Sequence, residues 1–189
     1  TELGDFIRLL PDNVVVVLDQ AYYEYIPEEL RIDVRSLIHE GYNLVALRTF
    51  SKAYGLAGLR MGYGFGRKEI IAELNRVREA FNTNLPGQAA ATAALQDQDF
   101  VRKSVEMNRK AMAMLYNGLD ELGLDYIPSA ANFVLIEVKR EAKDVFRDLL
   151  KRGVIVRPMG GYDMPYHIRV STSYEDDMRY FLEQLKEVM

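Results

Sequence analysis

A run of five apolar residues, Val14 to Leu18, constrains the fold of this chain more than any other segment. It follows the turn signal Pro11-Asp12-Asn13 and lacks the apolar–polar alternation of a strand with one wet face. Such a run is typical of a strand that is buried on both faces, as in a parallel sheet covered by helices. We therefore expect an α/β fold in which Asp19 lies at the carboxyl end of a strand, where open parallel sheets bind their ligands.

The rest of the chain predicts two α/β units, the first being part of a doubly wound, mostly parallel sheet and the second a smaller layer. In the first we expect a helix over 30–40, a strand over 43–48, tight turns over the glycine-rich stretch 55–66 and a helix over 69–81. In the second we expect helices over 88–96, 99–122, 142–152 and 173–188 and strands over 133–138, 154–157 and 167–171. Asp99 and Ser173 are the expected N-caps, and Gly123 is the expected stop of the longest helix.

Composition excludes several classes of protein. The 189 residues include 24 Lys and Arg against 28 Asp and Glu, a net charge of −4, which argues against a general nucleic-acid binder. The absence of cysteine excludes disulfides, thiolate metal sites and cysteine nucleophiles, and two histidines argue against a histidine-rich metal centre. No apolar run approaches the roughly 18 residues of a membrane helix, and no signal peptide is apparent, so we expect a cytoplasmic protein.

A lysine after the second expected strand is the strongest candidate for chemistry. Lys52 stands between the hydroxyl residues Thr49 and Ser51 and a glycine-rich turn that carries Arg60. Hydroxyl and guanidinium groups bind phosphate well, so an amine beside them suits a nucleophile next to an anion cradle. Taken singly, Lys52 also suits a solvated surface position. In the same way Asp19 alone suits a turn cap, and Tyr22 alone suits core packing.

Longer strings of residues resemble a known family. The strings are Asp19-Gln20-Ala21-Tyr22, then TFSKAYGLAGLR over 49–60, ANF over 131–133, VIVRPMGGY over 154–162 and HIRVS over 167–171. Together they resemble the fold-type I pyridoxal-phosphate aminotransferases, and within these the histidinol-phosphate aminotransferase branch. The resemblance follows the family's order along essentially the whole chain.

The resemblance implies a cofactor and a role for each matching residue. Pyridoxal 5′-phosphate would be held on Lys52 as a Schiff base, and the freed amine would then transfer the proton at the substrate Cα. Asp19 would pair with the ring nitrogen and Tyr22 with the phenolic oxygen of the cofactor. Ser51, Arg60 and Thr49 would hold the phosphate. Arg169, helped by Arg157, would bind the anionic end of the substrate.

The resemblance also implies that much of the enzyme is missing from this sequence. Family members are longer, and their first half supplies a glycine-rich phosphate loop, an aromatic that stacks on the cofactor, an asparagine and a tyrosine that reaches across a homodimer. We therefore expect this chain to be the C-terminal half of an aminotransferase, with its first residue at a cut in the longer protein. Residues 1–87 would be the end of the large domain, and 88–189 the linking helix and the small domain. Gln20, where the family has Glu, and Thr172-Ser173-Tyr174, where it often has a Gly step, are departures.

Three functions stay open on these grounds. The first is transamination between histidinol phosphate and 2-oxoglutarate, with glutamate as the product, in histidine biosynthesis. The second is a related pyridoxal-phosphate enzyme, such as an aromatic amino-acid aminotransferase or a threonine-phosphate decarboxylase. The third is a catalytically incompetent fragment or interaction module, because half of the cofactor pocket has no counterpart in this chain.

Overall fold

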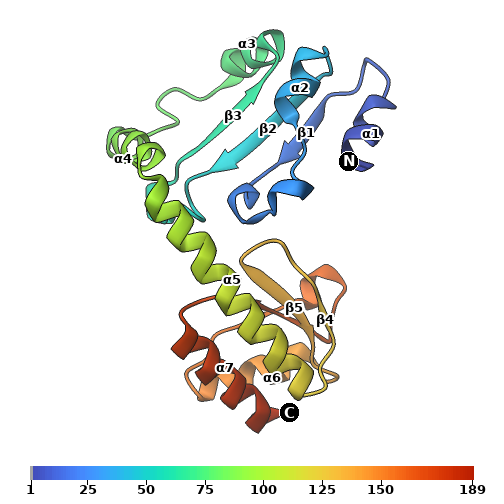
Figure 1. Cartoon of the computed structure of the whole chain (residues 1–189), viewed down its shortest axis with the longest axis vertical. Coiled ribbons are helices and arrows are strands. Elements are labelled where there is room, and N and C mark those ends of the chain that lie inside the picture. The colour runs from blue at the N-terminus through green and yellow to red at the C-terminus, as the bar shows by residue number, and fades with distance from the viewer. Residues whose placement is uncertain (1) are drawn as a thin grey trace. The chain divides into compact units, whose positions relative to one another are not determined.

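A computed structural model describes residues 2–189, which form two compact units divided after Arg102. Each unit is an α/β layer with its own sheet (Figure 1). The mixed α/β architecture expected from the sequence is confirmed. The assignment of 1–87 and 88–189 to two domains stays a prediction. Among the described residues, no helix combines the length and the apolar character needed to cross a membrane.

The first unit is built on a three-stranded sheet in the order β1-β2-β3. Its strands are β1 (Val16–Asp19), β2 (Leu44–Thr49) and β3 (Gly62–Gly66). The pair β1–β2 is parallel, as expected, and β3 runs antiparallel to β2. The prediction of tight turns over 55–66 was therefore wrong for residues 62–66, which form β3. Glycine serves there for a close backbone approach, because a Cβ on Gly66 would come within 2.6 Å of the carbonyl oxygen of Leu44.

The expectation that the Val14–Leu18 run is buried on both faces was also wrong. Val15 and Val17 are 53% and 62% exposed, whereas Val16 and Leu18 pack against the core of this unit. The two helices α1 (Glu2–Arg8) and α2 (Val34–His39) supply that core with Ile7, Val34 and Leu37. They cover one face of the sheet, and within the described residues the opposite face of β1 is left open to solvent (Figure 1).

Three further helices complete this part of the chain, and their ends differ from the predicted ones. They are α3 (Lys68–Val77), α4 (Leu85–Gln96) and α5 (Gln98–Glu121), the last of which continues into the second unit. The helix predicted to reach residue 81 ends at Val77 because Arg78 is extended and Phe81 takes a left-handed backbone conformation. The helix predicted over 30–40 forms only from Val34, where the Asp33 side chain accepts a hydrogen bond from the Ser36 amide.

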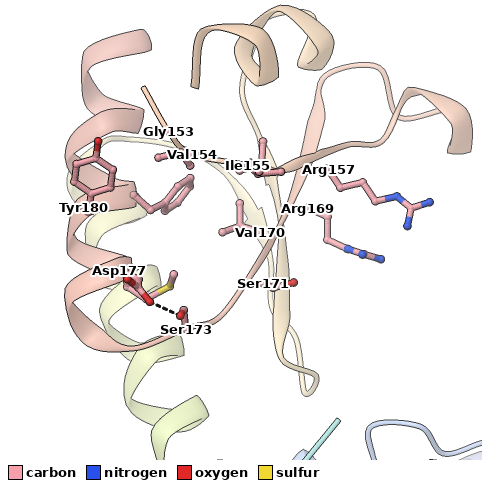
Figure 2. Close-up of a pocket in the computed structure, with 13 residues that line it drawn as sticks. Gly153, Val154, Ile155, Arg157, Arg169, Val170, Ser171, Ser173, Asp177 and Tyr180 are labelled. Atoms are coloured by element: carbon pink, nitrogen blue, oxygen red, sulfur yellow. Dashed lines mark hydrogen bonds between the residues drawn. The ribbon is translucent and has the colours of Figure 1, made fainter. Parts of the chain in front are cut away.

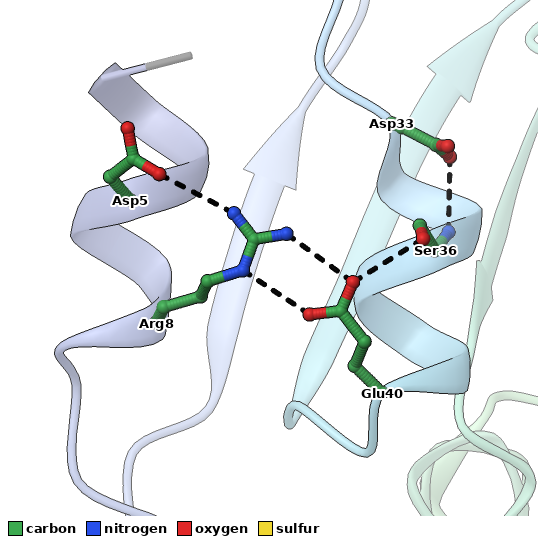
Figure 3. A network of polar contacts seen from close by, with 5 residues as sticks. All are labelled: Asp5, Arg8, Asp33, Ser36 and Glu40. Carbon is green, nitrogen blue, oxygen red and sulfur yellow. Dashed lines mark hydrogen bonds and ion pairs between the residues drawn. The ribbon is translucent and has the colours of Figure 1, made fainter.

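An exposed polar network links α1 to the end of α2 (Figure 3). The Arg8 guanidinium donates to both carboxylate oxygens of Glu40, at 3.2 and 3.3 Å, and also to Asp5. The Ser36 hydroxyl donates to the same Glu40 carboxylate. These hydrogen bonds hold the pKa of Glu40 below its usual range, the largest effect being the one from Arg8. The network therefore links α1 to the end of α2 through Arg8 and Glu40, which are 32 residues apart in the sequence.

Replacing Arg8 with methionine is expected to lower the unfolding temperature of the first unit slightly at neutral pH. A carboxyl whose pKa falls on folding contributes stability above its ordinary pKa of about 4.3, and this is lost as the pH drops through the folded value. The difference between wild type and Arg8→Met should therefore close in acid. Calorimetry across this pH range measures it, with Arg76→Met, which breaks an exposed pair within α3, as the control. A difference that persists in acid would mean that something other than the charge on the Glu40 carboxylate links the helices.

The second unit is a four-stranded antiparallel sheet with helices packed on one face. The strand order is β4-β5-β7-β6, with β4 (Tyr126–Ile127), β5 (Phe133–Glu137), β6 (Arg157–Pro158) and β7 (His167–Ser171). Helices α5, α6 (Ala142–Lys151) and α7 (Glu175–Val188) supply the other half of its core. The fully buried side chains at its centre include Leu115, Leu119, Val134, Ile136, Leu149, Ile168 and Leu185.

Local chemistry explains where the remaining predictions differ. Strand β6 begins at Arg157 and not at 154, because the Val154 amide donates to the Leu149 carbonyl and completes the end of α6. The Ser173 hydroxyl donates to the Asp177 carboxylate and does not cap α7, which begins at Glu175. Asp97, not Asp99, accepts the hydrogen bond from the Phe100 amide at the start of α5.

Candidate active site

The carboxyl ends of β1 and β2 lie at one edge of the first sheet. The two strands run parallel, with Asp19 opposite Leu47 in the register, so the chain leaves both strands on the same side (Figure 1). Residues 19–22 begin at the last residue of β1, and residues 49–52 begin at the last residue of β2. This edge is where open α/β sheets bind ligands. The parallel pairing therefore brings the predicted carboxylate and the predicted amine to one edge.

Asp19 is an exposed carboxylate at this edge. Its Oδ1 accepts a hydrogen bond from the Ala21 amide at 2.9 Å, which is the turn cap that the residue alone suggested. A carboxylate offers about four acceptor positions on two oxygens, so a cap of this kind is compatible with binding a ligand. Asp19 is thus held by its own turn in a defined orientation.

The structure brings Lys52 and Tyr22 together. The Lys52 Nζ lies 5.2 Å from the centre of the Tyr22 ring, a distance at which an ammonium group is attracted to the ring face. Both side chains are half-buried, and they come from turns that follow different strands. The aromatic ring therefore shields one side of the amine.

Ser51 and Arg60 form the polar cradle expected beside the lysine. The Arg60 Nη1 donates to the Ser51 hydroxyl at 3.5 Å and to the Ala57 carbonyl at 2.9 Å. The Thr49 hydroxyl accepts a hydrogen bond from the Ser51 amide at 3.0 Å. Arg60 also takes a left-handed backbone conformation, with φ of 55°, which is uncommon for a side chain of this size and is often found at ligand-binding positions. The cradle contains hydroxyl groups and a guanidinium, the donors that phosphate prefers.

The second unit places its two candidate arginines side by side. Arg157 of β6 is directly opposite Arg169 of β7 in the strand register. Figure 2 shows both guanidinium groups extending in the same direction from one end of an open pocket of about 460 Å³, whose other end is formed by α7. Like charges directly opposite one another destabilise a sheet, so an anion bound between them would relieve repulsion.

Each of these arginines has an aromatic neighbour. The Arg169 guanidinium lies 5.1 Å from the centre of the Phe133 ring, and Arg157 donates to the Tyr162 hydroxyl at 3.2 Å. The Arg169 Nε is buried, and no protein acceptor is found for it among the described residues. Sequence reasoning assigned no role to Phe133 or Tyr162, although both belong to the strings that carry the resemblance. A buried donor without an acceptor is costly, which again points to an anion at this position.

Six of the predicted site residues thus lie in the first unit and two in the second. Asp19, Tyr22, Thr49, Ser51, Lys52 and Arg60 are gathered at the ends of β1 and β2, and Arg157 and Arg169 face the same way on β6 and β7. What each residue does stays a prediction.

The fold, with its lysine, carboxylate and phosphate-type cradle, is the framework of a class of enzymes that transfer amino groups. The sequence profile of the aminotransferase class I and II family matches residues 1–185, and the chain belongs to this family. Among its relatives, the histidinol-phosphate aminotransferase of Caldicellulosiruptor saccharolyticus is 47% identical over 188 residues, 100% of this chain and 52% of that protein. The one of Methylobacillus flagellatus is 48% identical over 99% of this chain and 50% of that protein.

A solved structure supports the same grouping. The histidinol-phosphate aminotransferase of Sinorhizobium meliloti, in complex with pyridoxal-5′-phosphate, has a TM-score of 0.87 and 32% identity, covering 99% of this chain and 52% of that chain. The chain thus spans about half the length of the relatives it matches, and the matching part is their C-terminal portion.

The residues at the edge of the first sheet fit pyridoxal phosphate. This cofactor presents an anionic phosphate, a ring nitrogen that binds a proton and an aldehyde that reacts with amines. The Ser51–Arg60 pair suits the phosphate, the exposed Asp19 carboxylate suits the protonated nitrogen, and the Lys52 amine suits the aldehyde. The donor set therefore matches the group in charge and in chemistry.

Proposed function

We propose that this chain is the C-terminal part of a pyridoxal-phosphate aminotransferase that moves the amino group of histidinol phosphate to 2-oxoglutarate, a reaction of histidine biosynthesis. The observation that carries the proposal is the similarity along nearly the whole chain, 44% to 48%, to proteins named histidinol-phosphate aminotransferases. The complete enzyme would be a cytoplasmic homodimer, and the N-terminal half would supply the rest of the pocket.

Pyridoxal phosphate, when bound, supplies an electron sink that stabilises negative charge at the substrate Cα. Lys52 would hold the cofactor covalently and, once displaced by the substrate amine, move a proton at that carbon. Asp19 would keep the ring nitrogen protonated through its carboxylate, and Tyr22 would donate to the phenolic oxygen. Ser51 and Arg60 would anchor the phosphate, so that the reacting atoms keep a fixed position relative to the amine.

The cross-strand pair of Arg157 and Arg169 supports substrates with an anionic end. Histidinol phosphate carries a phosphate ester where an amino acid carries its carboxylate, and 2-oxoglutarate carries two carboxylates. A guanidinium binds either anion, often through two parallel hydrogen bonds. One pair of arginines can therefore serve both substrates in alternate half-reactions.

The proposal is tested by comparing substrates with the protein at its full natural length. Transamination to 2-oxoglutarate is measured with histidinol phosphate and with phenylalanine or tyrosine as amino donors, and release of carbon dioxide is measured with threonine phosphate. We expect kcat/KM to be highest for histidinol phosphate. A higher kcat/KM for an aromatic donor, or decarboxylation of threonine phosphate, would replace this function by one of its two relatives. No activity with any of them would favour a catalytically incompetent interaction module that keeps the fold.

A further inference from the structure

Gln20 is an unusual residue for a position beside an exposed edge. It is one of two polar side chains that are buried among the described residues, 5% exposed, and the other is Asn108 in the second unit, 7% exposed. Gln20 directly follows Asp19 at the end of β1 and precedes Tyr22 by two residues. A buried amide is costly unless it is hydrogen-bonded, so its partners indicate what it does.

The partners of Gln20 all join the end of β1 to the end of β2 or to its own turn. Its side-chain oxygen accepts a hydrogen bond from the Arg48 Nε at 3.2 Å. The backbone amide of Gln20 donates to the Leu47 carbonyl at 2.8 Å, and the backbone carbonyl of Gln20 accepts from the Tyr23 amide at 3.0 Å. Gln20 therefore holds the turn that carries Asp19 and Tyr22 against the strand that leads to Lys52.

Arg48 is itself held from several sides. Its guanidinium carbon lies 3.5 Å from the centre of the Tyr23 ring and 5.4 Å from that of Phe65. Burial raises the pKa of the half-buried Glu24, and the charges of Arg48 and Arg31 act against that rise. Arg48 is thus fixed by stacking and by charge, and it presents its Nε to Gln20 as a rigid donor.

Gln20 and Arg48 support the site from behind the sheet. Side chains alternate along strands, and Leu18, Leu44 and Ala46 pack into the core beneath α1 and α2. Arg48 continues this row, and Gln20 bonds to it. Asp19 lies two residues after the exposed Val17 on β1 and therefore shares the opposite face with it. The contact therefore lies on the covered face, while Asp19 lies on the open one.

We infer that Gln20 and Arg48 are positioning residues, whose buried hydrogen bond sets the register between the Asp19–Tyr22 turn and the Thr49–Lys52 turn. The inference rests on the proposed function, since it treats these two turns as halves of one site. Neither residue needs to contact the cofactor or the substrate. They would affect the chemistry by setting the distance between the Asp19 carboxylate and the Lys52 amine.

Amide hydrogen exchange of the protein at its full natural length, measured without cofactor, tests the inference. Gln20→Met keeps the length of the side chain but removes its acceptor. We expect the amides of Ala21 and Ser51, which bond within the two turns, to exchange about tenfold faster, the size expected for losing a hydrogen bond to a charged donor. Gln20→Glu restores an acceptor for Arg48 and should restore slow exchange. Arg48→Lys, which keeps the charge but not the guanidinium, should behave like Gln20→Met and replaces it if that variant does not fold.

Asn108→Ala is the matched control. It removes a buried amide that bonds to Ala131 and Thr172 in the second unit, and exchange at the two turns should stay as in wild type. Faster exchange in Gln20→Met spread evenly over the first unit and not reversed by Gln20→Glu would mean a merely structural role. Unchanged exchange at Ala21 and Ser51 would also overturn the inference.

A second readout links the contact to the amine. The protein at its full natural length is incubated with pyridoxal phosphate and reduced with borohydride, and mass spectrometry gives the fraction fixed on Lys52 relative to the other lysines. We expect Gln20→Met to lower the selectivity for Lys52 and Gln20→Glu to restore it. Wild-type selectivity in Gln20→Met would count against the inference. If wild type itself shows no selectivity for Lys52, the proposed cofactor site fails in this chain, and the exchange experiment still decides the register.

Discussion

Replacing Lys52 with alanine is expected to abolish transamination and covalent capture of pyridoxal phosphate while leaving the fold intact. The amine is proposed to do two things, to hold the cofactor and to move the proton at the substrate carbon, and a methyl group does neither. Loss of the proton-transfer role alone lowers rates by roughly 10²–10⁴, and loss of covalent attachment adds to this. Turnover with histidinol phosphate and the visible absorption of the bound cofactor are the measurements, on the protein at its full natural length.

The structure explains why the fold should survive this change. The Lys52 side chain is half-buried, it packs over the Tyr22 ring, and the turn is held by a backbone hydrogen bond from Gly55 to the Lys52 carbonyl. Lys68→Ala, which removes an exposed lysine at the start of α3 in the same unit, is the control and should retain activity and cofactor. Full activity in Lys52→Ala would remove the central residue of the proposed function.

Arg169→Ala is expected to raise KM for histidinol phosphate and for 2-oxoglutarate by a factor on the order of 10², because truncating one partner of a desolvated charge pair costs about 2–5 kcal/mol. Arg169 is half-buried against Phe133, and its Nε has no protein acceptor among the described residues, so its donors suit a ligand. Cofactor affinity should change much less, since the proposed cofactor residues lie in the other unit. Steady-state kinetics with both substrates and a cofactor titration separate the two effects.

Arg147→Ala is the matched control for this variant. The exposed Arg147 lies in the same unit, on α6, and pairs with Asp144 one turn away on the same helix, so its loss should leave both KM values unchanged. Unchanged KM values in Arg169→Ala would contradict the assignment of this arginine to the substrate. A rise for one substrate only would mean that the two anions bind in different ways.

Much of the fold could be predicted from the spacing of apolar residues and from the residues that end helices and strands. Strand β7 and the long helix α5 were predicted within one residue, because their apolar spacing and the left-handed Gly123 at the end of α5 are local signals. Strand β3 was missed because its glycines look like turns, and they serve a close approach to β2 that exists only after the strands pair. The caps at Asp99 and Ser173 were misplaced because several acidic or hydroxyl side chains compete near each helix start, and geometry selects one.

The sequence likewise identified some residues of the candidate site and missed others. Lys52, Asp19, Arg60 and Arg169 were identified from strings of neighbouring residues, because a site built at strand ends leaves its residue types in short, ordered motifs. Gln20 and Arg48 were not identified as a pair. Their contact joins residues that are 28 positions apart, and no local pattern marks it.

The sequence by itself determined the family, the α/β class and the chemical groups available, since these depend on residue types and on local spacing. Only the tertiary structure decided which face of Val14–Leu18 is covered, that Arg157 and Arg169 are cross-strand neighbours, and that Lys52 packs on Tyr22. The reason is physical: burial and contact depend on which distant segments pack together, and a run of valines has the same local preference whether one or both of its faces are covered.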